Sequence, residues 1–182
     1  MKDCTEQRAA PYVLPAWKIN QIIVNAIDFL SQEEYYKDGF DYKNSISKKG
    51  ILIKAYSDFN PKNLNELQKV SLSLWNDGLC LIFPDTESQK TCCMIAYNDN
   101  KPAAEIMQII FHEYAHIFLK HTEQSPNAEA EAILFSAIAT FLLIAEQRFH
   151  ICSMINNQQN KESFFDGLKD GLMEKIVNKE VI

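Results

Sequence analysis

Residues 103–121 form an apolar segment that also carries three of the four histidines of the chain. Its isoleucines and phenylalanines recur at helical spacing, which predicts a helix that is buried over most of its surface. Two of the histidines, His112 and His116, are four residues apart and therefore lie on one face of that helix. Because imidazoles at such depth need a partner, the fold must bring this helix to a metal ion or to other polar groups.

Glu113 follows the first histidine and is turned about 100° from it by the helix period. This rotation moves its carboxylate away from an ion held by His112 and His116 and toward the water that would attack a substrate. The pattern H-E-x-x-H thus places two metal ligands and a general base on one rigid element. Zinc, or another divalent transition metal, lowers the pKa of a water to about 7, and the glutamate can then take its proton. Two purely structural histidines are the weaker interpretation, because the pattern seldom arises by chance.

A catalytic zinc site needs a third protein ligand. His121 is five residues after His116, about 140° round the helix, so it is poorly placed to bind the same ion. The next predicted helix, 125–143, begins with Glu129 and Glu131. Glu129 is favoured as the third ligand because its face of the helix carries small residues that let two helices approach closely. Glu131 is the alternate, and favourable interaction with the helix dipole explains whichever acid does not bind.

The remaining sequence predicts an α+β fold, in which a small antiparallel three-stranded sheet packs on a mainly helical body. The expected elements before residue 102 are helices at 15–32 and 61–75 and strands at 50–59, 78–83 and 91–99. The last two strands are close enough to form a hairpin, with a turn at "PDTES" (84–88). From Pro102 onward the chain is expected to be helical almost to its end, with Pro102 and Pro126 in first helical turns.

The chain of 182 residues is long enough for one sizeable core, and a second full domain is not expected. Residues 1–182 are therefore interpreted as a single domain. It comprises an N-terminal helical part (1–48), a small sheet with a helix insert (50–99) and a helical part with the metal site (102–182). The tyrosines and phenylalanines of 35–43 are expected to pack in the core rather than to form a lid or a docking patch.

Charge and composition argue against several classes of protein. The net charge of −6, without a basic stripe, argues against direct nucleic-acid binding. The five cysteines are odd in number and form no C-x-x-C pair, so free thiols in a reducing cytoplasm are expected. No signal-peptide pattern begins the chain, and the longest apolar stretch, 132–145, is too short to span a bilayer. It is expected to be a buried helix of a cytoplasmic protein without membrane association.

The sequence around the histidines resembles the ImmA/IrrE metallo-endopeptidases. "HEYAHIFLKH" and the following "EAEAILF" are similar to the family pattern HExxHxxLxH and, after a short polar loop, ExEAxxF. The matching residues are His112, Glu113, His116, Leu119, His121, Glu129, Glu131, Ala132 and Phe135. The resemblance covers about residues 90–136, including the strand "MIAYND" before the helix. Ala115 stands where the family has glycine and Ser136 where it has alanine, and the paired leucines come three residues late.

The resemblance implies a cytoplasmic zinc-dependent endopeptidase with a zincin-like active-site helix. Members of the family typically cleave a DNA-bound regulator, such as a phage or mobile-element repressor. The expected partner is therefore a protein substrate of that kind, encoded apart from a stand-alone protease domain. The alternative is a module that binds zinc and a regulator without cutting the regulator, and a third reading is a structural domain without metal.

An extended substrate is expected to add to the edge of the sheet along residues 92–98. The oxyanion formed on attack needs a hydrogen-bond donor beyond the metal. Tyr97, His121 and His150 are the candidates, and each also has a structural explanation. His121 is suited to the C-terminal end of its helix, and His150 lies on a polar stretch typical of the surface.

Overall fold

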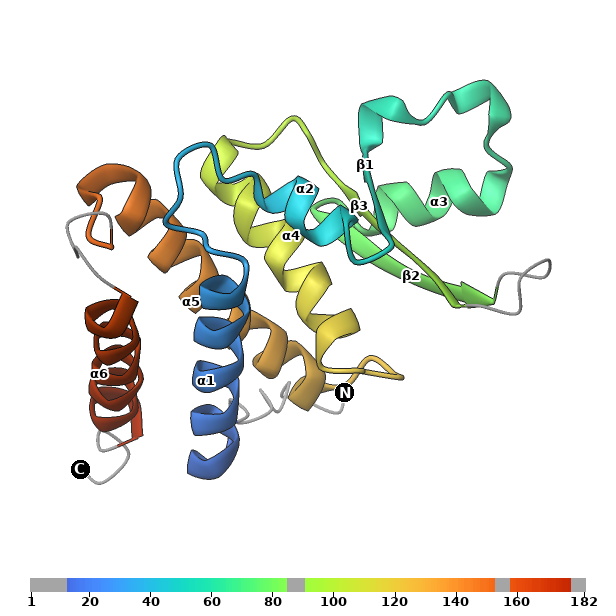
Figure 1. Ribbon diagram of the computed structural model, residues 1–182. Helices are drawn as coiled ribbons and strands as arrows, with labels where there is room; N and C mark the ends of the chain where they lie inside the picture. Colours follow the sequence, from blue (N-terminus) through green and yellow to red (C-terminus); the bar gives the residue numbers. More distant parts are fainter. Residues whose placement is uncertain (1–12, 85–90, 153–157, 178–182) are drawn as a thin grey trace, which may run out of the picture.

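The computed structural model describes residues 13–84, 91–152 and 158–177, and within these ranges the α+β class is confirmed. The helices are α1 (Ala16–Gln32), α2 (Tyr42–Ser47), α3 (Glu66–Leu74), α4 (Ala103–Phe118), α5 (Pro126–Phe149) and α6 (Gln158–Val177). The strands are β1 (Ile51–Ala55), β2 (Gly78–Pro84) and β3 (Thr91–Tyr97), and two 3-10 turns, Tyr56–Asp58 and Pro61–Asn63, precede α3. Figure 1 shows α6 and α1 on one side, α5 and α4 in the centre and the sheet on the other side.

The sheet is mixed, so the prediction of a fully antiparallel sheet is wrong in part. The strand order is β1-β3-β2, and β3 pairs antiparallel with β2 but parallel with β1. Only six residues connect β2 to β3, and such a short connection requires the antiparallel pair that the sequence predicted. The turn expected at 84–88 falls mostly outside the described residues. β1 is linked to β2 through a long segment that contains α3, and a connection of that length permits either strand direction.

The helices pack around aromatic side chains. Phe111 of α4 and Phe135 of α5 are fully buried, and the ring of Phe29 on α1 lies 6.3 Å and 6.2 Å from theirs, measured between centroids. The same core extends to Ile95 of the central strand. Tyr35 is buried, and the other aromatic residues of 35–43 pack against this core, in agreement with the role expected for them.

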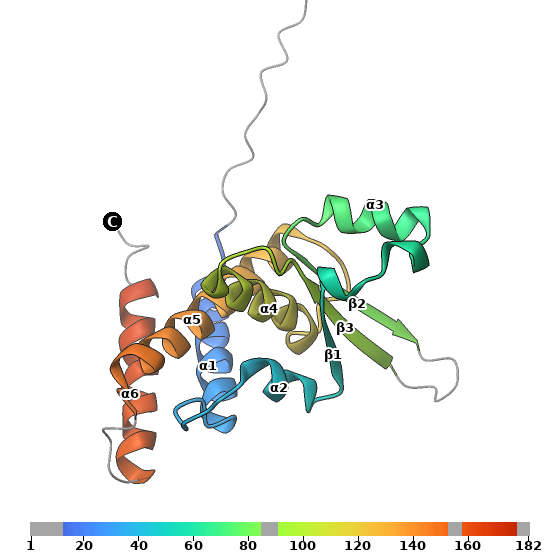
Figure 2. The same cartoon turned by 90° about the horizontal axis from the view of Figure 1, so that it is seen from above.

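α5 is long and apolar enough to cross a membrane, judged by length and composition alone. However, 56% of its most apolar window is buried inside the protein. Figure 1 shows that it crosses behind α1, and Figures 1 and 2 show that it runs beside α4. It thus occupies the position of a core helix, as expected for the apolar stretch 132–145. The expectation that this stretch is too short to span a bilayer does not hold, because the helix runs from Pro126 to Phe149.

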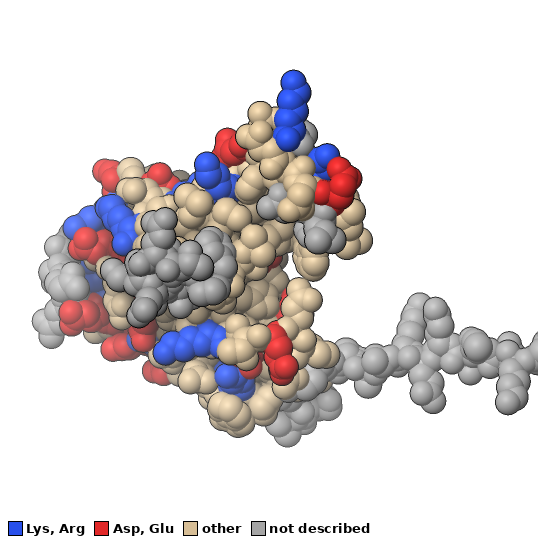
Figure 3. Space-filling view, turned by 90° about the vertical axis from the view of Figure 1, so that its right-hand side faces the viewer, with Lys and Arg blue, Asp and Glu red and all other residues tan. Residues whose placement is uncertain are grey.

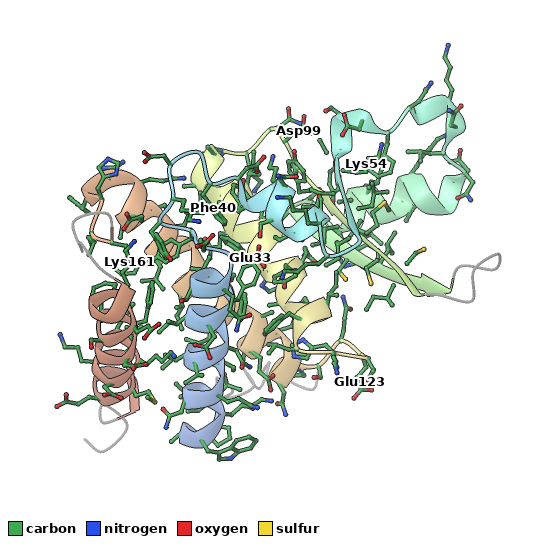
Figure 4. The ribbon with its side chains drawn as sticks, in the orientation of Figure 1. Glu33, Phe40, Lys54, Asp99, Glu123 and Lys161 are labelled. Atoms are coloured by element: carbon green, nitrogen blue, oxygen red, sulfur yellow. The ribbon has the colours of Figure 1, made fainter. Side chains whose placement is uncertain are left out.

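Glu33, just after α1, connects this helix to α2 (Figure 4). Its two carboxylate oxygens accept hydrogen bonds from Ser45 Oγ and Lys49 Nζ, both at 2.5 Å. Burial alone would raise the pKa of Glu33, but the bonds from Lys49 and Ser45 outweigh it and lower the pKa below its ordinary value. The ionised carboxylate therefore stabilises the junction of α1 and α2.

Replacing Glu33 by Gln is expected to lower the free energy of unfolding at pH 7 by about 1 kcal/mol, because the charge-assisted bond to Lys49 is lost. The pKa is lower in the folded state, so the contribution is complete above the unfolded pKa of about 4.3 and disappears as the pH falls through the folded value. Urea denaturation from pH 7 to pH 3 should therefore show the two proteins converging. The matched control is Glu34→Gln, since the ion pair of Glu34 with Lys37 is exposed to solvent. A difference between parent and Glu33→Gln that is as large at pH 3 as at pH 7 would contradict this role.

Candidate metal centre

α4 carries His112, Glu113 and His116 on the side that faces β2 and the start of α5. The two histidines are one helical turn apart, and their rings meet edge to face with centroids 4.9 Å apart. His112 Nε2 lies 3.2 Å from His116 Nε2. The helix therefore directs both nitrogens at the same point, as the four-residue spacing predicted.

The start of α5 brings an acid to this point. Ser125 caps the helix, since its Oγ accepts a hydrogen bond from the Ala128 N–H at 3.2 Å, and Pro126 occupies the first helical position. This fixed start sets Glu129 in the first turn, where its Oε2 lies 3.3 Å from His112 Nε2 and its Oε1 lies 3.7 Å from His116 Nε2. Glu129, and not Glu131, is thus the acid that joins the two histidines.

His112, His116 and Glu129, here called the metal triad, fit a metal ion. Their donor atoms all lie within 4.8 Å of one another. Two ligands bonded to zinc at 2.0–2.1 Å in a tetrahedral arrangement are about 3.3 Å apart, close to the separations seen around His112 Nε2. Two imidazoles and one carboxylate are also the ligand set of many catalytic zinc sites with an open fourth position. The triad can therefore hold zinc or another divalent transition metal.

Electrostatics in the triad favours the form of histidine that binds metals. Burial lowers the pKa of His112, although the carboxylate of Glu129 opposes this shift. Burial and the neighbouring His112 lower the pKa of His116 to about 4. Both imidazoles are consequently neutral at neutral pH, with a lone pair free to coordinate an ion.

The side chain of Glu113 extends from α4 toward β2, beside the triad. Burial raises the pKa of Glu113 to about 7, and the charge of Glu129 adds to this shift. The backbone N–H of Cys80 donates to the Glu113 carboxylate and opposes it. A carboxylate with a pKa near neutrality is well matched to the work of a general base. The sequence identified Glu113, but it gave no sign that a backbone N–H of β2 would hold its side chain.

Gly78 allows β2 to approach α4 this closely. A Cβ atom at this position would lie 2.5 Å from Ile109 Cγ2 and 3.4 Å from Glu113 Cγ. Ile109 is β-branched and has little rotameric freedom on a helix, so it cannot easily move away. The glycine therefore permits the contact that sets Glu113 against β2.

Replacing Gly78 by Ala is expected to lower the free energy of unfolding by about 1–3 kcal/mol, the usual cost of overpacking. Chemical denaturation would measure the change. The matched control is Gly167→Ala on α6, where an added Cβ meets nothing within 4 Å and a helical alanine is favourable by roughly 0.5–1 kcal/mol. Equal free energies of unfolding for Gly78→Ala and Gly167→Ala would show that the close approach of β2 to α4 does not exclude a side chain at position 78.

A cavity of about 880 Å³ opens beside the triad. The β2 segment 79–82 lines it, and so do residues 122–126, which comprise the end of the connection after α4 and the first residue of α5. Figure 3 shows the surface hollowed between the part that carries α3 and the body below it, and Figure 4 places Glu123 on the connection between α4 and α5. A second cavity of about 320 Å³, lined by Asp77 and Lys101 among others, shares His112 and Glu113 with the first. The reactive side chains thus border open space on two sides.

The prediction that a substrate pairs with residues 92–98 is wrong. These residues belong mainly to β3, which is the central strand and is already paired on both sides. Among the described strands, β2 is the edge strand that borders the cavity. Of the two edge strands in the described residues, β1 and β2, it is therefore β2 that offers a free edge beside the triad.

The three candidate oxyanion donors lie in different places. Tyr97 faces α2, and its hydroxyl accepts a hydrogen bond from Lys43 Nζ at 2.7 Å, away from the cavity. His150 is the C-cap of α5, 21 residues after Glu129 and thus about 31 Å away along the helix. His121 does line the cavity, but its two ring nitrogens contact His116 and Glu131. The structure therefore brings only His121 to the site.

Comparisons of this chain with protein-family models, with curated proteins and with solved structures found no match. The geometry and chemistry of the site are therefore the basis for its function. That geometry is a metal triad, a partly buried carboxylate beside it, and an edge strand along the same cavity.

Proposed function

We propose that this protein is a zinc-dependent endopeptidase of the ImmA/IrrE type. The observation that carries the proposal is the convergence of His112, His116 and Glu129 with Glu113 at the wall of one cavity. Each side chain has the chemistry that peptide hydrolysis requires at its position: two neutral imidazoles, an anionic ligand and a base with a pKa near 7. The similarity of the motif to that family favours peptide-bond hydrolysis as the reaction.

Each residue at the site has a distinct role in peptide hydrolysis. His112, His116 and Glu129 would hold the metal, and its Lewis acidity would be available to the scissile carbonyl and the attacking water. Glu113 takes a proton from the attacking water and passes it to the leaving amine. The N–H of Cys80 keeps the Glu113 carboxylate in one orientation during these transfers. His112, His116 and Glu129 fix the position at which attack occurs.

The surroundings of the triad suit a segment of polypeptide. Apart from the Cys80 N–H, which donates to Glu113, N–H and C=O groups along the free edge of β2 can pair with an extended chain, which would then pass close to Glu113. The apolar side chains of Leu79, Leu81 and Ile82 line the cavity and can contact those of the substrate. The family resemblance points to a DNA-binding repressor or regulator as this substrate, reached in the cytoplasm. The net charge of −6 favours recognition of the regulator itself rather than of its DNA.

The test is hydrolysis of a proteome-derived peptide library by the zinc-loaded protein, read by mass spectrometry. We expect new termini that disappear when a chelator is added and return when zinc is restored. An absence of cleavage in the library and in folded regulators, with metal bound, would favour the alternative module that binds a regulator without cutting it. Glu113→Gln separates the two functions further, because it removes the base and leaves the metal triad intact.

A further inference from the structure

A line of three polar side chains leads away from the triad behind His116. His116 Nδ1 lies 2.9 Å from His121 Nδ1, and His121 Nε2 lies 3.2 Å from Glu131 Oε2. The same Glu131 oxygen lies 3.2 Å from Lys18 Nζ on α1. Lys18, Glu131 and His121, here called the polar relay, come from α1, from α5 and from the connection between α4 and α5.

The chemistry of the relay allows one arrangement of protons when both imidazoles are neutral. The ionised carboxylate of Glu131 can only accept, so His121 Nε2 must carry a hydrogen and donate it. His121 Nδ1 is then an acceptor, and His116 Nδ1 must be the donor across the 2.9 Å contact. This leaves the lone pair of His116 on Nε2, the nitrogen that faces His112 and Glu129. The other tautomer of His116 would place a hydrogen where a metal ion must bind.

We propose that the polar relay is a positioning device, which holds His116 in the tautomer and orientation that bind the metal. This inference rests on the proposed metal centre. It assigns a role to His121 and Glu131 that differs from transition-state stabilisation and from direct ligation. It also assigns a role to Lys18, which lies 94 residues before the first histidine of the motif (112 − 18).

Lys18 is needed because Glu131 is buried. The exposed fraction of Glu131 is only 8%, and a carboxylate at that depth is costly unless a cation and hydrogen-bond donors compensate it. Lys18 supplies the cation, and its side chain is itself 25% exposed, so it is partly withdrawn from water. With Lys18 removed, the buried Glu131 carboxylate would lose its cation partner and would turn toward solvent, where it no longer contacts His121. α1 is in this way coupled to the metal centre.

The experiment measures the dissociation constant for Zn²⁺ of the folded, full chain, by competition with a chromophoric chelator. His121→Ala is expected to weaken zinc binding about 10- to 100-fold, the usual effect of removing a partner of a metal-bound histidine. His121→Asn keeps an acceptor near the position of Nδ1 and should recover much of the affinity. Lys18→Met should weaken binding several-fold, and Lys18→Arg should restore it. Absorption of bound Co²⁺ would report the altered geometry independently of affinity.

The matched control is Lys169→Met. Lys169 also pairs with an α1 carboxylate, that of Asp28 at 2.6 Å, and its side chain is 20% exposed, but it lies on α6, away from the site. A merely structural relay would lower the unfolding midpoint of the metal-free protein and leave the zinc affinity of the folded variants unchanged. Affinities of His121→Ala and Lys18→Met within twofold of the parent would therefore overturn the inference while the metal centre stands. A parent protein that binds no zinc would overturn the metal centre and the relay together.

Discussion

Glu113→Gln is expected to reduce peptide hydrolysis about 10²- to 10⁴-fold while the protein still binds one metal ion. The size of the effect follows from the contribution of general acid–base catalysis, since glutamine has the shape of glutamate but cannot accept a proton. Metal binding should persist, because the metal triad consists of His112, His116 and Glu129 and does not include Glu113. The measurement compares initial rates on one peptide from the library, together with zinc content by elemental analysis.

The matched control for this variant is Glu123→Gln. Glu123 lines the same cavity, from the connection between α4 and α5, but it is not a member of the metal triad (Figure 4). We expect a rate within about threefold of the parent, as for surface substitutions outside reactive groups. Full activity of Glu113→Gln would remove Glu113 from the mechanism. An unchanged effect of Glu113→Gln on a regulator, with no cleavage by either protein, would establish a binding module instead.

Local periodicity predicted much of this molecule. The bounds of α1 and α4, Ala16–Gln32 and Ala103–Phe118, agree closely with the ranges 15–32 and 103–121. Contacts within one helix turn are set by the helix period, so the pairing of His112 with His116 could be read from spacing alone. The preference for Glu129 also came from a helical face, since its face carries the small residues that allow α5 to approach α4.

Long-range features could not be predicted in the same way. The long connection through α3 fixes neither the direction of β1 nor its partner strand. The pairing of β1 with β3, which leaves β2 at the sheet edge, could therefore not be predicted. Lys18 and Glu131 are 113 residues apart (131 − 18), and no pattern near either residue indicates the other. The parts of the site that one helix contains were therefore accessible from the sequence, whereas the strand beside it and the relay behind it depend on tertiary packing.

Loss of a residue of the metal triad is expected to abolish zinc binding. The parent protein is expected to carry about one zinc per chain after purification, and His116→Ala should carry almost none, because two remaining ligands hold zinc poorly in competition with water and buffer. Removal of zinc by a chelator should also lower the unfolding temperature of the parent. A metal present at 100 times its dissociation constant stabilises the folded state by about 2.7 kcal/mol.

Two pairs of variants make this measurement specific. His150→Asn is the control for His116→Ala, because His150 lies at the far end of α5 in a left-handed conformation (φ 49°) that asparagine tolerates. Glu129→Gln should lose more zinc affinity than Glu131→Gln, since the first removes a donor atom within 3.3 Å of His112 Nε2 and the second acts only through His121. The reverse order would make Glu131 the third ligand. Equal zinc content in the folded parent and in folded His116→Ala would show that His116 is not a zinc ligand.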